Sequence, residues 1–134
     1  MSNPNKAKGD RAEMAARDFL RANGFPGTER TRAGYTRDLG DLHLSPGALA
    51  QVKDCRVLRW GEWLPDLAAQ IENHGADVGF LVVKRPGLGQ MQVGRWLAVM
   101  PVQQMTDLIR AAGYGTPLDA DPVISRDLLS KESG

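Results

Sequence analysis

DLHLSPGALAQVK, residues 41–53, is the stretch that decides the fold of this chain. Polar and apolar side chains alternate over its first four residues, which is typical of a half-buried strand. Residues 45–47 read Ser-Pro-Gly and predict a turn. Residues 48–53 then form a second short strand. The stretch therefore predicts a β-hairpin.

The two faces of this hairpin differ in chemistry. Successive side chains of a strand point to opposite faces, so Asp41 and His43 share one face of the first strand. On the second strand Gln51 and Lys53 share a face, and the apolar residues take the other one. The polar face collects a carboxylate, an amide and an ammonium group, with His43 placed where it could touch a phosphate. This arrangement suits hydrolysis of a phosphodiester with a divalent cation.

Each polar group has a chemical role in that reaction. A hard cation such as Mg²⁺ prefers oxygen ligands, which Asp41, Gln51 and the backbone carbonyl of Val52 can supply. Lys53 would lie beside the attacking water or the phosphate and stabilise charge in the transition state. Asp38 competes with Asp41 as the ligand. We prefer Asp41 because it begins the alternating strand, whereas Asp38 suits a cap or turn.

Three motifs occur in a fixed order: Lys8-Gly-Asp-Arg-Ala-Glu13, then Gly40-Asp41, then Gln51-Val-Lys53. Over about residues 6–100 this order resembles the PD-(D/E)XK nuclease superfamily, and within it the small archaeal-type and phage Holliday junction resolvases. The resemblance implies that Glu13, Asp41 and Gln51 hold the metal and that Lys53 completes the catalytic set. Glutamine stands at residue 51 where the family pattern has glutamate. An amide binds a divalent cation less strongly than a carboxylate, which makes Glu13 more important.

A first helix is predicted over residues 6–22, since its apolar residues recur at helical spacing and Asn23-Gly24 is a stop signal. Glu13 lies at the edge of this apolar stripe and could look inward over the sheet. The alternative is a surface pair with Arg17, four residues on.

A second helix is predicted over residues 63–74, with Pro65 in its first turn and Gly75 as its stop. The residues predicted to face the core are Leu64, Leu67, Ala68 and Ile71. The nuclease resemblance also singles out Gln70, since related enzymes place a polar helix residue near the cleft. A plain surface position is the preferred alternative for Gln70.

The remaining elements complete an α/β fold. Residues 28–32, 78–84 and 96–100 are predicted strands, the second of them continuously apolar as in a buried strand. A third helix follows over residues 102–112. Together these elements predict a mixed central sheet flanked by helices, and the resemblance implies a restriction-endonuclease-like core. We expect one nuclease domain over residues 1–112 and a C-terminal tail over 113–134.

Basic residues are concentrated in the first part of the chain. The 134-residue chain has a net charge of only +1, but up to Arg37 it carries eight basic and four acidic residues. Such a cluster favours contact with a phosphate backbone, although a solvated helix face is the alternative. The residues predicted to contact DNA are Lys8, Arg11, Arg32, Tyr35, Arg37 and Arg56.

The location expected for the protein is the cytoplasm of a cell or of a phage-infected host. Cys55 is the only cysteine, so no disulfide can form within the chain. No apolar run is long enough for a membrane helix, and the first residues lack the apolar segment of a signal peptide.

The function expected from these features is that of a metal-dependent DNA endonuclease using Mg²⁺ or Mn²⁺. The resemblance implies a branched substrate such as a four-way junction, cut by a homodimer with two sites. Three alternatives remain. The protein could cut duplex DNA as restriction and repair enzymes do, or it could be an inactive nuclease-derived DNA-binding module, which Gln51 favours. It could also be a structural partner in a larger complex.

Overall fold

The computed structural model describes residues 4–30 and 41–119. Its contacts divide the chain into two units, residues 1–99 and residues 100–134. The first unit contains the sheet and the hairpin. The second contains one described helix, α3 (Val102–Ala111), close to the predicted bounds of the third helix. The predicted division into a domain over residues 1–112 and a tail stays a prediction.

A five-stranded mixed sheet forms the centre of the first unit, with the strands in sequence order. The strands are β1 (Glu29–Arg30), β2 (Asp41–Ser45), β3 (Ala48–Lys53), β4 (Val78–Val83) and β5 (Leu97–Val99). Strands β3 and β4 are parallel, and the other neighbouring pairs are antiparallel. The predicted α/β class with a mixed sheet is confirmed.

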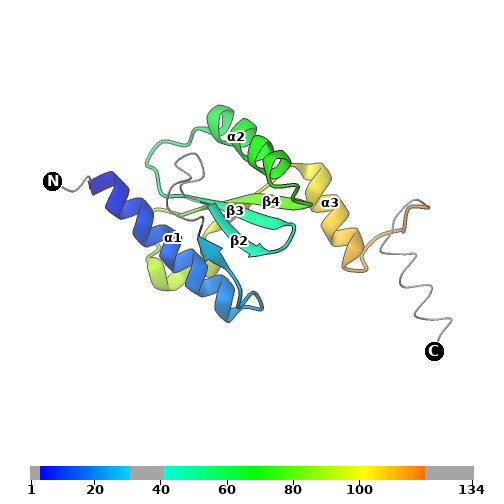
Figure 1. The fold of residues 1–134 in the computed structure, drawn as a ribbon, viewed down its shortest axis with the longest axis horizontal. Coiled ribbons are helices and arrows are strands. Elements are labelled where there is room, and N and C mark those ends of the chain that lie inside the picture. Colours follow the sequence, from blue (N-terminus) through cyan, green and yellow to red (C-terminus); the bar gives the residue numbers. More distant parts are fainter. Residues whose placement is uncertain (1–3, 31–40, 120–134) are drawn as a thin grey trace. The chain divides into compact units, whose positions relative to one another are not determined.

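Helices cover both faces of the sheet (Figure 1). On one face, α1 (Pro4–Ala22) and the 3₁₀ segment η2 (Gln90–Arg95) pack on the side chains that include Leu42 and Ala50. On the other face, α2 (Trp60–Asn73) packs on Leu49, Leu81 and neighbouring side chains. The residues of the hairpin thus alternate between two separate apolar clusters. The polar face predicted from the sequence is the face that α2 covers.

The hairpin itself forms as predicted. Gly47 closes its turn with φ +85°, a conformation that disfavours side chains with a Cβ. The carbonyl of Gly47 accepts hydrogen bonds from the amides of Asp77 and Val78, at 2.8 and 3.0 Å. These bonds join the turn to the start of β4. The register of the parallel pair is therefore set at its first residue.

The second helix differs from the prediction in its start and in its buried face. It begins at Trp60, where the carbonyl of Arg59 accepts the first bonds, so Pro65 lies inside the helix instead of in its first turn. The buried positions include Trp63, and Ala68 is exposed, so its predicted core position was wrong. The large indole of Trp63 occupies the face toward the sheet, and Ala68 points away from that face.

Two strands were only partly predicted, and one helical segment was missed. The first strand is limited to Glu29 and Arg30 among the described residues, and β5 is shorter than expected. The segment η2 was not predicted at all, because its sequence has no helical apolar repeat.

None of the helices in the described residues combines the length and apolarity needed to cross a bilayer.

Gly79 on β4 provides a test of the packing under α2. A Cβ at this position would lie 2.5 Å from Ile71 Cγ1 and 2.6 Å from its Cδ1. We expect Gly79→Ala to lower the free energy of unfolding by about 1–3 kcal/mol, the usual cost of overpacking. Gly9→Ala is the control, since nothing lies within 4 Å of a Cβ there. In the middle of α1 it should stabilise by about 0.5–1 kcal/mol. Urea denaturation of both variants measures the difference, and equal stabilities would contradict it.

Candidate metal and phosphodiester site

Asp41 and Gln51 face each other across the two strands of the hairpin. The carbonyl of Lys53 accepts a hydrogen bond from the amide of Lys84 at 2.9 Å, so Lys53 directs its backbone groups toward β4. Gln51, two residues earlier, directs its own backbone groups the same way. Asp41 and Gln51 are therefore a non-hydrogen-bonded pair, the kind of antiparallel pair whose side chains lie closest.

Both side chains of this pair are buried. Asp41 has 0% and Gln51 has 3% of its surface exposed. The Oε1 atom of Gln51 has no hydrogen-bond partner among the residues that the structure describes. A buried acceptor without a partner costs about 1–3 kcal/mol. That cost is offset if a cation or another donor binds there.

Lys53 lies two residues after Gln51 on β3, so its side chain is on the same face of the strand. Its Nζ lies 5.6 Å from the centre of the Trp63 ring, within the range of a cation–π interaction. Trp63 is itself buried at the start of α2. The ammonium group is therefore held toward α2, on the same face of β3 as Gln51.

Gln70 is buried between two contacts that align α2 with the hairpin. At one end His74 lies edge-on to His43, with ring centres 4.8 Å apart, and at the other Trp63 meets Lys53. Along α2, Gln70 lies between Trp63 and His74. On the strands, the Asp41–Gln51 pair likewise lies between the partners of these two residues, Lys53 and His43. Gln70 is 5% exposed, and its Oε1 has no hydrogen-bond partner in the described part of the chain. The preferred surface position for Gln70 was wrong.

The carbonyl of Val52 points to the β2 side of β3, because carbonyls alternate along a strand and that of Lys53 points to β4. This direction is the one that its predicted role as a ligand requires. Asp41 and Gln51 thus face each other across the hairpin, and Gln70 is buried on the helix that covers this face.

Glu13 has a different environment. It lies on α1, which packs on the opposite face of the sheet, and its Oε1 accepts a hydrogen bond from Nε of Arg30. Arg30 also pairs with Asp10 at 3.1 Å. The hydrogen bond from Arg30 to Glu13, and the charges of Glu13 and Asp10, raise the pKa of the Arg30 guanidinium. The alternative pair with Arg17 is not formed, since Arg17 bonds to Asp18. The predicted metal role of Glu13 stays a prediction, and it requires displacement of Arg30.

Removing Arg30 tests how tightly Glu13 is held. Arg30→Met leaves the buried Glu13 carboxylate without its cation, which costs about 3–5 kcal/mol for a fully buried pair. Since the Arg30 side chain is 34% exposed, we expect a smaller loss of about 1–2 kcal/mol. Arg17→Met, which removes the bond to exposed Asp18, should cost less than about 0.5 kcal/mol. Thermal unfolding at neutral pH compares the two variants. Equal losses would mean that Arg30 stabilises Glu13 no more than a surface pair would.

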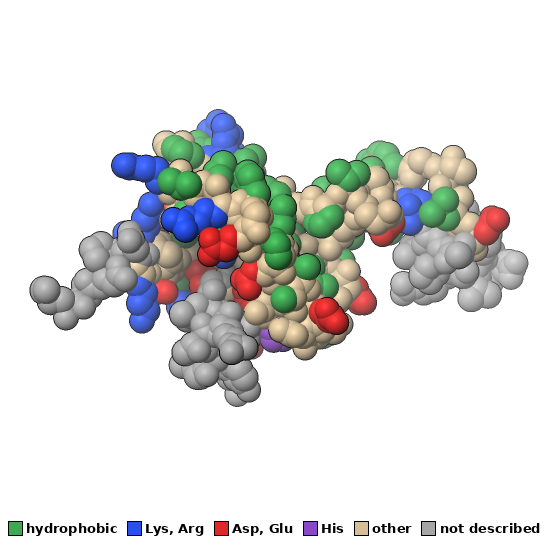
Figure 2. All heavy atoms as spheres, turned by 90° about the horizontal axis from the view of Figure 1, so that it is seen from above, with side chains coloured by type: hydrophobic (Ala, Val, Ile, Leu, Met, Phe, Trp, Pro, Cys, Tyr) green, Lys and Arg blue, Asp and Glu red, His purple; other side chains and the backbone are tan. Residues whose placement is uncertain are grey.

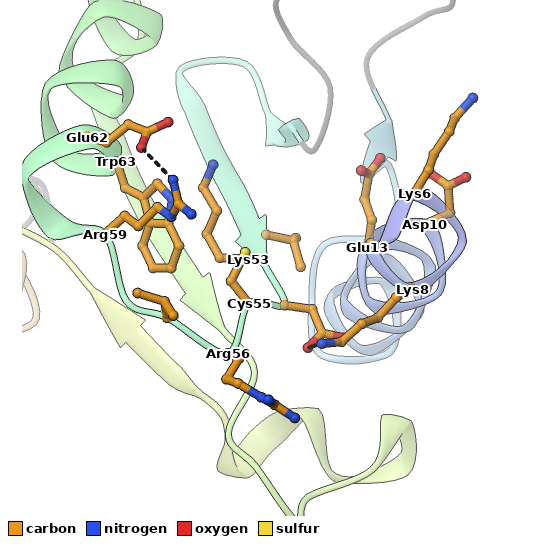
Figure 3. A pocket seen from close by; sticks show the side chains of 14 residues that line it. Lys6, Lys8, Asp10, Glu13, Lys53, Cys55, Arg56, Arg59, Glu62 and Trp63 are labelled. Atoms are coloured by element: carbon orange, nitrogen blue, oxygen red, sulfur yellow. Dashed lines mark ion pairs between the residues drawn. The ribbon is translucent and has the colours of Figure 1, made fainter. Parts of the chain in front are cut away.

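A pocket of about 780 Å³ opens beside Lys53, between the first part of α1, the end of β3 and the start of α2 (Figure 3). Glu13 and Lys53 both line it. At its floor the Asp54 carboxylate, 10% exposed, lies 3.4 Å from the ammonium of Lys8 and 3.7 Å from that of Lys84. Lys8, a predicted DNA contact, is thus engaged with a carboxylate in the protein alone.

The other predicted site residues have varied positions. Arg11 is exposed on α1, and Arg56 is exposed at the rim of the pocket. Four residues with predicted roles lie outside the described part of the chain: Arg32, Tyr35, Arg37 and Asp38. Sequence reasoning missed Arg30 and Asp54, since charged residues are common and no spacing marks their partners. Trp63 could have been found as a bulky residue at the helix start.

The donor set fits a weakly held divalent cation. No group of three or more His, Cys, Asp or Glu side chains within residues 4–30 and 41–119 is arranged to hold a metal. Asp41 instead supplies one carboxylate beside the neutral oxygens of Gln51, Val52 and Gln70. Mg²⁺ is commonly bound by one or two carboxylates, with water and substrate phosphates completing its shell. These are oxygen types that Mg²⁺ or Mn²⁺ accepts, and binding of either cation at this buried position stays a prediction.

Comparison with known proteins gives no relative from which a function could be carried over. No protein-family model, curated protein or solved structure matches the chain.

Proposed function

We propose that this protein is a metal-dependent DNA endonuclease of the PD-(D/E)XK type, with a restriction-endonuclease-like core. The observation that carries the proposal is the facing pair of Asp41 and Gln51, with Lys53 on the same face of β3. The Oε1 atom of Gln51 is buried without a hydrogen-bond partner among the described residues, and a bound cation would offset the cost of that burial.

Each residue of the site has a defined role in the proposed reaction. Asp41 and Gln51 would hold Mg²⁺ or Mn²⁺, with the carbonyl of Val52 and Gln70 beside them. The bound cation supplies Lewis-acid polarisation of the phosphoryl group and a hydroxide at neutral pH. Lys53 orients the attacking water or stabilises the charge that develops on the phosphoryl oxygens. Its contact with Trp63 limits the positions that the ammonium group can take.

The proposed substrate is branched DNA, and the proposed assembly is a homodimer. A four-way junction has two-fold symmetry and needs two cuts, which a symmetric dimer provides. Cationic side chains around the pocket, among them Lys6, Arg56 and Arg59, would contact phosphates. Duplex DNA, cut as by restriction or repair enzymes, is the alternative substrate with the same catalytic residues.

Cleavage of labelled four-way junction and matched duplex, each with Mg²⁺, Mn²⁺ or EDTA, tests the proposal. Metal-dependent nicking of the junction alone supports a resolvase, and equal cutting of both DNAs supports a general endonuclease. Absence of cutting by folded protein that still binds DNA would overturn the enzyme proposal.

A second candidate is an inactive DNA-binding module derived from a nuclease. Two observations favour it: residue 51 is an amide, and the Glu13 carboxylate is engaged by Arg30. Only Asp41 then offers an anionic ligand at the site. Such a module would bind DNA with a strong salt dependence and cut neither substrate.

A further inference from the structure

The loop between β3 and α2 exposes two adjacent aliphatic side chains. Val57 is 60% exposed and Leu58 is 50% exposed, although most large aliphatic side chains of the sheet are buried in its two clusters. Single exposed apolar residues are ordinary on protein surfaces. Here two neighbours, of which Val57 lines the charged pocket, form a small apolar tip on the loop.

An arginine lies on each side of this tip. Arg56 is exposed and makes no hydrogen bond or ion pair with the residues that the structure describes. Arg59 lies 3.7 Å from Glu62, with both side chains more than 60% exposed. An exposed pair of this kind contributes little to stability, so Arg59 can exchange Glu62 for a phosphate at small cost. In Figure 3 the Arg59 side chain extends toward Glu62, whereas the Arg56 side chain extends away from Glu62.

The surroundings of the tip carry excess positive charge. Each of the four carboxylates lining the pocket has a cationic partner: Arg30 for Asp10 and Glu13, Lys8 for Asp54, and Arg59 for Glu62. The cations of Lys6, Lys53 and Arg56 remain in addition. Figure 2 shows Lys and Arg side chains gathered at this end of the first unit, with hydrophobic side chains between them.

We propose that Val57 and Leu58 form a wedge that enters branched DNA where base stacking is interrupted, while Arg56 and Arg59 bind the flanking phosphates. Aliphatic side chains inserted between bases are a general means of holding distorted DNA, and cations beside them contact the backbone. At a branch point the stacking is already broken, so insertion costs less than it does in a duplex. Val57 lines the same pocket as Lys53, so a branch held by the wedge would lie on the Lys53 side of the proposed site. The inference rests on the proposed function, because it specifies the substrate of that site.

The test compares binding of a four-way junction and a matched duplex in EDTA at one salt concentration. The junction carries 2-aminopurine at the branch, whose fluorescence rises when the base is unstacked. The double variant Val57→Ser with Leu58→Ser should lose at least about tenfold in junction affinity and much of the fluorescence change, since two aliphatic contacts are removed. Its duplex affinity should stay within about twofold, because the phosphate contacts remain.

Two further variants sharpen the comparison. Met91→Ser is the matched control, since Met91 is 98% exposed on η2, and it should leave both affinities unchanged. Arg56→Gln with Arg59→Gln should weaken binding of both DNAs and reduce the salt slope by about two.

Wild-type junction preference in the double serine variant would overturn the wedge. So would unchanged DNA binding with a loss of self-association in light scattering, which would assign the tip to a protein contact. A wild-type protein that binds neither DNA would overturn both the wedge and the proposed function. If the wedge variants behave as expected but no metal supports cleavage, the wedge stands and only the enzyme proposal fails.

Discussion

Asp41→Asn is expected to reduce metal-dependent cleavage by about a hundredfold or more, the usual effect of removing a group that stabilises charge in the transition state. Asp41 is the one carboxylate of the facing pair, and an amide in its place would leave only neutral oxygens around the cation. The substitution keeps the size of the side chain. Because Asp41 is fully buried, the folding of the variant is measured together with its activity.

Cleavage rates at several Mg²⁺ and Mn²⁺ concentrations measure this effect, alongside circular dichroism of each protein. Asp66→Asn is the matched control, since Asp66 is an exposed carboxylate of α2. It should cut DNA at the wild-type rate. Full activity of folded Asp41→Asn would place the chemistry elsewhere in the protein.

Gln51→Glu is expected to make the stability of the fold depend on a divalent cation. The new carboxylate would lie directly opposite Asp41, in a pair that is almost fully buried. Two like charges about 5 Å apart repel by about 3 kcal/mol at an effective dielectric constant of about 20. In EDTA the melting temperature should therefore fall by about 10 °C or more, given the size of the unit.

Addition of Mn²⁺ or Mg²⁺ should reverse that loss, because a cation between the two carboxylates replaces repulsion by attraction. The same variant should cut DNA at lower metal concentration than the wild type. Gln51→Met is the control, since it removes the amide and adds no charge, and its melting temperature should not respond to metal. Equal stability of Gln51→Glu in EDTA and in metal would mean that its carboxylate and that of Asp41 do not meet.

The two strands and the turn of the hairpin were predictable because their determinants are local. The alternation over residues 41–44 and the Ser-Pro-Gly turn define which side chains share a face. Between His43 and Ser45 the register shifts by one residue, and without that shift Asp41 would lie opposite Val52. The local pattern did not predict this irregularity, which brings Asp41 opposite Gln51.

The surroundings of the hairpin depend on contacts that no local pattern contains. Gln70 is polar and was expected at the surface, yet α2 lies so that His74 meets His43 and Trp63 meets Lys53. That alignment buries Gln70. It is determined by how a whole helix packs on the sheet, and the sequence of the helix alone is compatible with several rotations about its axis.

Ion pairs between residues far apart in the chain could not be predicted from the sequence either. Glu13 has Arg17 as its local candidate, one helical turn away, but pairs with Arg30 on a different element. Arginine side chains are long, and many carboxylates lie within their reach in a folded chain. Only the packing of α1 beside β1 selects Arg30. The ion pair between Glu13 and Arg30 could therefore not be predicted from the spacing of residues in the sequence.

One carboxylate joins three parts of the chain next to Lys53. Asp54 pairs with Lys8 of α1 and with Lys84, and the amide of Lys84 also donates to the carbonyl of Lys53. Strand ends usually fray, opening many times before the core does. Here fraying of β3 would also have to break two ion pairs that bridge to other elements. We therefore expect the beginning of α1 and the ends of both parallel strands to open together, and the amide hydrogens near Lys53 to exchange more slowly than those of an unpaired strand end.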